Sequence, residues 1–77
     1  MPISPELVEE LNILTRYNLA SAQEGIKVHH TAAPELISAV KRLHSKGLVD
    51  QEDGGYLTSL GIEVAEHIQK AMIILAD

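Results

Sequence analysis

The chain has 77 residues, a formal net charge of −5 and no cysteine. The lack of cysteine excludes disulfides, thiolate catalysis and cysteine-ligated metal sites. No apolar run is long enough to span a bilayer, and the first residues show no secretory signal pattern. We therefore expect one soluble cytoplasmic domain over residues 1–77. Because Phe and Trp are absent, its core must be aliphatic.

Charge is unevenly distributed along the chain. Residues 1–26 carry a net charge of −3, residues 27–46 carry +3, and residues 47–77 carry −5. The net negative charge argues against a non-specific nucleic-acid binder, because affinity for phosphates comes from Lys and Arg. The positive middle segment weakens that objection, although such an asymmetry also arises by chance in a short chain.

The first predicted helix begins at Pro5 and runs to about Tyr17. Ser4 suits the N-cap position, and Pro5 suits the first helical position because its missing N–H would have no partner there. The apolar residues that share one face of this helix are Leu7, Leu11 and Leu14. We expect Glu9 and Glu10 on the opposite, exposed face.

A second, short helix is predicted over residues 19–27. Ser21 is a suitable N-cap, and Glu24 three residues later completes a capping box. Residues 28–33 then form a connection, which ends where Pro34 starts the next element.

The third helix, residues 34–46, has the clearest pattern. Its buried face carries Leu36, Val40 and Leu43, and its exposed face carries Ser38, Lys41, Arg42 and Ser45. His44 lies toward the buried side. Gly47 follows as a C′ residue that can adopt positive φ.

Residues 48–58 predict a β-hairpin, because Asp53-Gly54-Gly55 provides the composition of a tight turn. Thr58 then caps a last helix over residues 59–76. The end of this helix is apolar all round, which is unusual for a lone surface helix. We expect its residues to pack on the first helix or to form the interface of a homodimer, and these residues are Met72, Ile73, Ile74 and Leu75.

The predicted fold is mainly α with a small β-hairpin, in the order helix, helix, helix, hairpin, helix, which is the order of a winged helix-turn-helix domain. The stretch Leu36-x3-Val40-x2-Leu43-x2-Lys46-Gly47-Leu48-Val49, followed by Tyr56-Leu57-Thr58-x2-Gly61, resembles the signature of multiple-antibiotic-resistance-type regulators. The whole chain resembles a small bacterial family that shares SPEL, EELN, SAQEG and DGGYLT and is generally described as hypothetical or DNA-binding.

The resemblance implies a transcriptional regulator that reads double-stranded DNA with helix 34–46. The residues that it implies for DNA contact are Lys27, His29, His30, Ser38, Lys41, Arg42 and Ser45. Arg42 is the first candidate for a base contact. The tip of the wing departs from the pattern, because it reads Asp50-Gln51-Glu52-Asp53 where such regulators carry basic residues. A dimer would offset that repulsion by doubling the basic face.

The alternatives to DNA binding are a merely solvated helix face and a winged-helix module that binds another protein. We expect no metal, because adjacent histidines in a loop (His29 and His30) rarely converge on one ion, and His67 is predicted to face inward. The chain has no nucleophile elbow and no phosphate-binding Gly-rich loop. We therefore expect neither a cofactor nor enzymatic activity.

Overall fold

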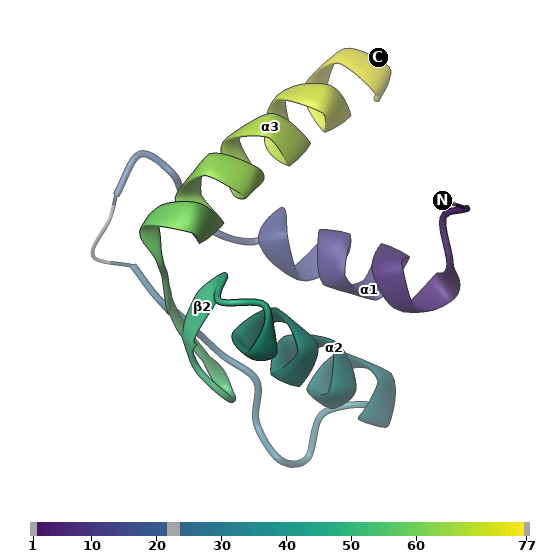
Figure 1. Ribbon diagram of the computed structural model, residues 1–77, viewed down its shortest axis with the longest axis vertical. Coiled ribbons are helices and arrows are strands. Elements are labelled where there is room, and N and C mark those ends of the chain that lie inside the picture. Colours follow the sequence, from purple (N-terminus) through teal and green to yellow (C-terminus); the bar gives the residue numbers. More distant parts are fainter. Residues whose placement is uncertain (1, 22–23, 77) are drawn as a thin grey trace.

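The computed structural model describes residues 2–21 and 24–76, which form three helices and a three-stranded antiparallel sheet (Figure 1). The strand order in the sheet is β1-β3-β2. This mainly helical fold with a hairpin confirms the predicted fold class and is consistent with a winged-helix-like arrangement. The elements are α1 (Pro5–Leu14), β1 (Ile26–Lys27), α2 (Pro34–Ser45), β2 (Val49–Gln51), β3 (Gly54–Leu57) and α3 (Ser59–Leu75).

The core lies between α1, α2 and the sheet, and it is aliphatic as predicted apart from one tyrosine. Its buried members are Ile13, Leu14, Tyr17, Val28, Ala39, Val40, Leu43, Leu48 and Val49. Burial, followed by the negative charge of Asp50, raises the pKa of Tyr17 to about 12. The Tyr17 hydroxyl donates to the Gly55 carbonyl oxygen at 3.1 Å, so the core is tied to the hairpin.

The predicted helix over residues 19–27 is wrong for the described part of that segment. Leu19 and Ala20 form a turn in which the Asn18 side chain accepts from the Ala20 N–H at 2.9 Å. Residues 26–27 form strand β1, which pairs with β3, and residues 22–23 of the predicted helix lie outside the described residues. The capping signal is weak and local, and the backbone pairing with β3 prevails over it.

The hairpin lies where it was predicted, with β2 and β3 joined by the turn at residues 52–53. Gly54 and Gly55 adopt φ values of 122° and 70°, which only glycine adopts readily. The Asp50 carboxylate accepts from the Tyr56 N–H at 2.9 Å and so closes the base of the turn.

Helix α3 runs from its Thr58 cap along the C-terminal end of α1 and then diverges from it (Figure 1). The Gln69 side-chain amide donates to the Leu14 and Tyr17 carbonyl oxygens at 3.1 and 2.8 Å, and thereby joins the two helices. Beyond this point, the last turns of α3 leave Ile73 78% and Leu75 77% exposed. The predicted alternative, in which this apolar end packs on α1, is therefore wrong. No described helix is long and apolar enough to cross a membrane.

Candidate nucleic-acid interface

The exposed face of α2 presents three of the predicted contact residues to solvent. Ser38, Lys41 and Ser45 are all exposed, as the helical periodicity predicted. In the segment that precedes α2, the predicted contact residues are also exposed, namely Lys27, His29 and His30. The structure therefore displays six of the seven predicted residues on the surface.

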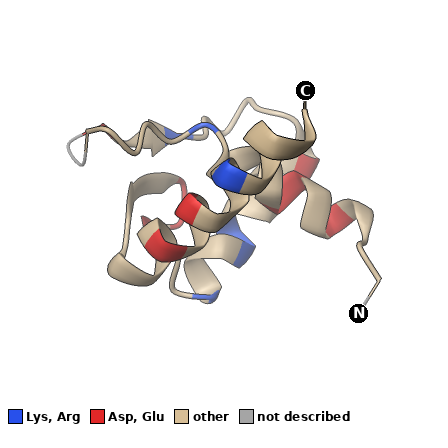
Figure 2. Ribbon diagram, turned by 90° about the horizontal axis from the view of Figure 1, so that it is seen from above, with Lys and Arg blue, Asp and Glu red and all other residues tan. Residues whose placement is uncertain are grey.

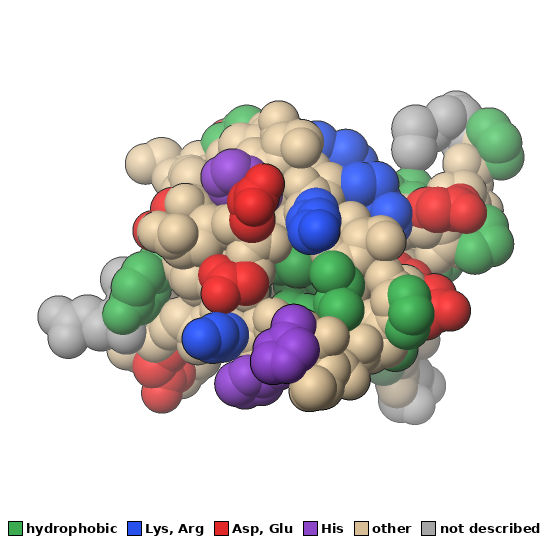
Figure 3. Space-filling model, turned by 90° about the horizontal axis from the view of Figure 1, so that it is seen from below, with side chains coloured by type: hydrophobic (Ala, Val, Ile, Leu, Met, Phe, Trp, Pro, Cys, Tyr) green, Lys and Arg blue, Asp and Glu red, His purple; other side chains and the backbone are tan. Residues whose placement is uncertain are grey.

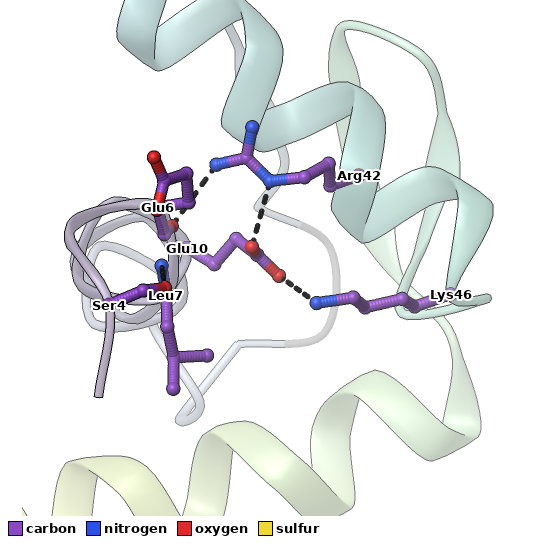
Figure 4. Close-up of polar contacts among 6 residues, drawn as sticks. All are labelled: Ser4, Glu6, Leu7, Glu10, Arg42 and Lys46. Atoms are coloured by element: carbon purple, nitrogen blue, oxygen red, sulfur yellow. Dashed lines mark hydrogen bonds and ion pairs between the residues drawn. The ribbon is translucent and has the colours of Figure 1, made fainter. Parts of the chain in front are cut away.

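Arg42 is the exception, because its guanidinium turns toward α1 (Figure 4). Its Nε donates to Glu10 Oε2 at 2.9 Å, and its Nη2 donates to the Glu6 carbonyl oxygen at 3.1 Å. The ammonium of Lys46 donates to the other carboxylate oxygen of Glu10. We call Glu10, Arg42 and Lys46 the Glu10 cluster. The residue expected to contact a base is thus engaged within the protein.

Glu10 is only 4% exposed, so its predicted position on the exposed face of the first helix is wrong. Burial raises the pKa of Glu10, but the hydrogen bonds and charges of Lys46 and Arg42 outweigh burial and hold that pKa below its ordinary value. The carboxylate therefore stays ionised at neutral pH and neutralises part of the positive charge at the end of α2. Acidic and basic residues are interspersed along the ribbon (Figure 2).

Beside the exposed face of α2 lies an open groove of about 670 Å³, which we call the α2–wing groove (Figure 3). Apolar atoms form its floor, while Lys, His and acidic side chains surround it. His44 lines one wall and is half-buried, in line with its predicted orientation. The lining residues are Lys27, Val28, His30, Ile37, Val40, Lys41, His44, Gln51, Glu52 and Asp53.

The turn between β2 and β3, residues 52–53, is called the wing turn below. Its Glu52 and Asp53 line the same groove as Lys27 and Lys41. The Val28 N–H donates to the Asp53 carbonyl oxygen at 2.7 Å and fixes the turn against the start of the β1–α2 connection. Backbone pairing therefore brings the acidic turn close to the basic residues, and a phosphate on this face would meet charges of both signs.

The four histidines lie on three parts of the chain, namely the β1–α2 connection, α2 and α3. His29 and His30 are exposed before α2, and His67 is exposed on α3 rather than facing inward as predicted. Within residues 2–21 and 24–76, no group of three His, Cys, Asp or Glu side chains is arranged to hold a metal ion.

Three helices with a small antiparallel sheet, in which a hairpin follows the second helix, define a fold compatible with the winged-helix class. Over residues 1–76 the chain matches the model of a family described as a family of unknown function, DUF5669, and it belongs to that family. No curated protein and no solved structure matches the chain.

Proposed function

We propose that the protein binds double-stranded DNA through the exposed face of α2 and acts as a transcriptional regulator of the winged-helix type. The observation that supports this function is the row formed by Ser38, Lys41 and Ser45, all exposed on one helix. Hydroxyl and ammonium groups are common phosphate contacts, and a helix face of this kind fits the major groove. Lys27 adds a second cation beside the row.

This binding is weak and sensitive to salt. The Glu10 cluster engages Arg42 and Lys46, which leaves Lys27 and Lys41 as the cations nearest to the proposed DNA. Two phosphate contacts give a slope of about −2 when the logarithm of affinity is plotted against the logarithm of salt concentration. Glu52 and Asp53 reduce the affinity further by repelling phosphates.

Replacement of Lys41 by alanine is expected to weaken DNA binding several-fold. It is also expected to make the slope of log affinity against log salt concentration less negative by about 1. Arg42→Ala is expected to change affinity less, because the guanidinium already contacts Glu10. Fluorescence anisotropy with a labelled genomic duplex of about 20 base pairs, long enough for two half-sites, measures both effects at about 50 and 200 mM salt.

Lys70→Ala is the matched control for this titration, because Lys70 is exposed on α3 and its loss changes the net charge equally. Equal losses in the Lys41 and Lys70 variants would contradict a contact by α2. Absence of binding even at low salt would contradict the proposed function and favour a protein-binding module, for which the acidic wing turn is the supporting observation.

We further propose that two copies associate through the apolar end of α3. This end exposes four consecutive large apolar side chains, Met72, Ile73, Ile74 and Leu75. A two-fold axis brings the same patch of both copies together, so a second copy covers it without any other partner. Such a dimer also presents two α2 faces to the duplex.

Replacement of Ile73 by glutamate is expected to shift the mass measured by sedimentation equilibrium from dimer toward monomer, since a charge would be buried in the interface. Ile3→Glu, which changes another exposed isoleucine (71% exposed) outside α3, is expected to leave the association unchanged. A wild-type mass that stays monomeric at every concentration would contradict the dimer.

A further inference from the structure

We infer that the α2–wing groove is a docking site for an extended peptide segment of a partner protein, in which an aliphatic residue is flanked by an acidic residue on one side and a basic residue on the other. This inference goes beyond the proposed DNA binding and does not depend on it.

The size and construction of the groove fit such a segment. Its volume of about 670 Å³ lies within the range of about 300–1,000 Å³ that is typical of ligand sites. Its walls come from the β1–α2 segment, from α2 and from the wing turn. The pairing of β1 with β3 and the bond from Val28 to Asp53 hold these walls together, so the site is formed before a ligand arrives.

The floor of the groove favours an aliphatic anchor. Ile37 and Val40 of α2 and Val28 of the preceding connection line this floor. Val40 and Val28 are buried core residues, and Ile37 is the most accessible of the three. Ile37 is half-buried, so an inserted side chain would complete its removal from water. Apolar atoms are visible at the bottom of the hollow, enclosed by polar side chains (Figure 3). An apolar centre within a polar rim is the usual anatomy of a protein-docking site.

The charges around the groove favour a polypeptide over a nucleic acid. Lys27 and Lys41 supply positive charge, and Glu52 and Asp53 supply negative charge. A nucleic acid lying across the groove would place phosphates against these carboxylates. A peptide that carries both signs matches both groups, and charge complementarity of this kind sets the orientation of the ligand. Because Lys41 serves both surfaces, a docked segment would also displace DNA.

The probe is a short acetylated peptide with two acidic residues, two leucines and two lysines in that order, titrated into the isotope-labelled full chain and followed by NMR. We expect chemical-shift changes confined to the groove, with a dissociation constant on the order of 1 mM or below. Glu52→Lys and Lys41→Glu change only exposed side chains, and each is expected to weaken the peptide at least about tenfold, or about 1.4 kcal/mol. Glu66→Lys, an exposed change of the same kind on α3, is expected to leave binding unchanged.

A control peptide with serines in place of the leucines is expected not to bind. Equal binding of both peptides, shifts outside the groove, or no shifts at millimolar peptide would each overturn the docking site. A parallel titration with duplex DNA separates the two proposals, because bound DNA with no bound peptide overturns only the groove. Bound peptide without bound DNA supports the groove and contradicts the proposed function.

Discussion

Replacement of Gly61 by alanine is expected to lower the free energy of unfolding by about 3 kcal/mol, because a methyl group there would overlap the Leu48 carbonyl oxygen. The Leu48 carbonyl oxygen also accepts a hydrogen bond from the Thr58 N–H at 3.1 Å. The added methyl group would therefore disturb the contact between the start of α3 and the base of the hairpin. A domain of this size has only a few kcal/mol of stability. Urea unfolding followed by circular dichroism is therefore expected to show a mostly unfolded variant near room temperature.

Gly47→Ala is the matched control for this substitution. An added Cβ at position 47 meets no atom within 4 Å, and only the positive φ of 80° opposes it. Its expected cost is about 1–2 kcal/mol. Gly61 has no positive φ, so a loss of stability in the Gly61 variant no larger than in the Gly47 variant would contradict the close approach to the Leu48 carbonyl oxygen.

Helices α1 and α3 could be predicted from the sequence because their first turns are marked by local capping side chains. Ser4 caps α1, and its hydroxyl accepts from the Leu7 N–H at 3.1 Å. Thr58 caps α3 in the same way through the Gly61 N–H at 3.0 Å. Strand β1 could not be predicted, since its two residues are a strand only by virtue of their pairing with β3. Gly25, which weakens a helix, lies where an added Cβ would crowd the Gly55 carbonyl.

The exposed face of α2 could also be predicted, but the Glu10 cluster could not. The spacing of Leu7, Leu11 and Leu14 placed Glu10 on the far side of the first helix. In the structure the buried stripe of this segment runs through Ile13, Leu14 and Tyr17, and Glu10 stands three, four and seven residues before them. That spacing is a signal for burial. Arg42 in the last turn of α2 and Lys46 at its C-cap are four residues apart, and both are suitable partners. Their actual pairing depends on how α1 packs against α2, which periodicity does not determine.

Replacement of Glu10 by glutamine is expected both to destabilise the protein and to strengthen DNA binding. At pH 7 the loss of two charge-assisted contacts costs about 2 kcal/mol, less than for a fully buried pair because Arg42 and Lys46 remain 34% and 51% exposed. The pKa of Glu10 is lower in the folded state than its ordinary value of 4.5. Its stabilising effect is therefore present above that value and is lost as the pH falls through the folded-state pKa.

Urea titrations over a pH series measure the free energy of unfolding. The glutamine variant is expected to lack the loss of stability at acid pH that comes from protonation of Glu10. Anisotropy titrations measure the change in DNA binding. Release of Arg42 and Lys46 is expected to make the slope of log affinity against log salt concentration more negative by up to about 2. Glu9→Gln is the matched control, because it removes the same charge from the neighbouring residue of α1. A general effect of net charge on DNA affinity is expected in both variants. Release of Arg42 and Lys46 for DNA contact is expected only in the Glu10 variant, because only Glu10 pairs with them. Identical salt slopes for the two variants would show that the Glu10 cluster does not restrain the DNA-facing charge of α2.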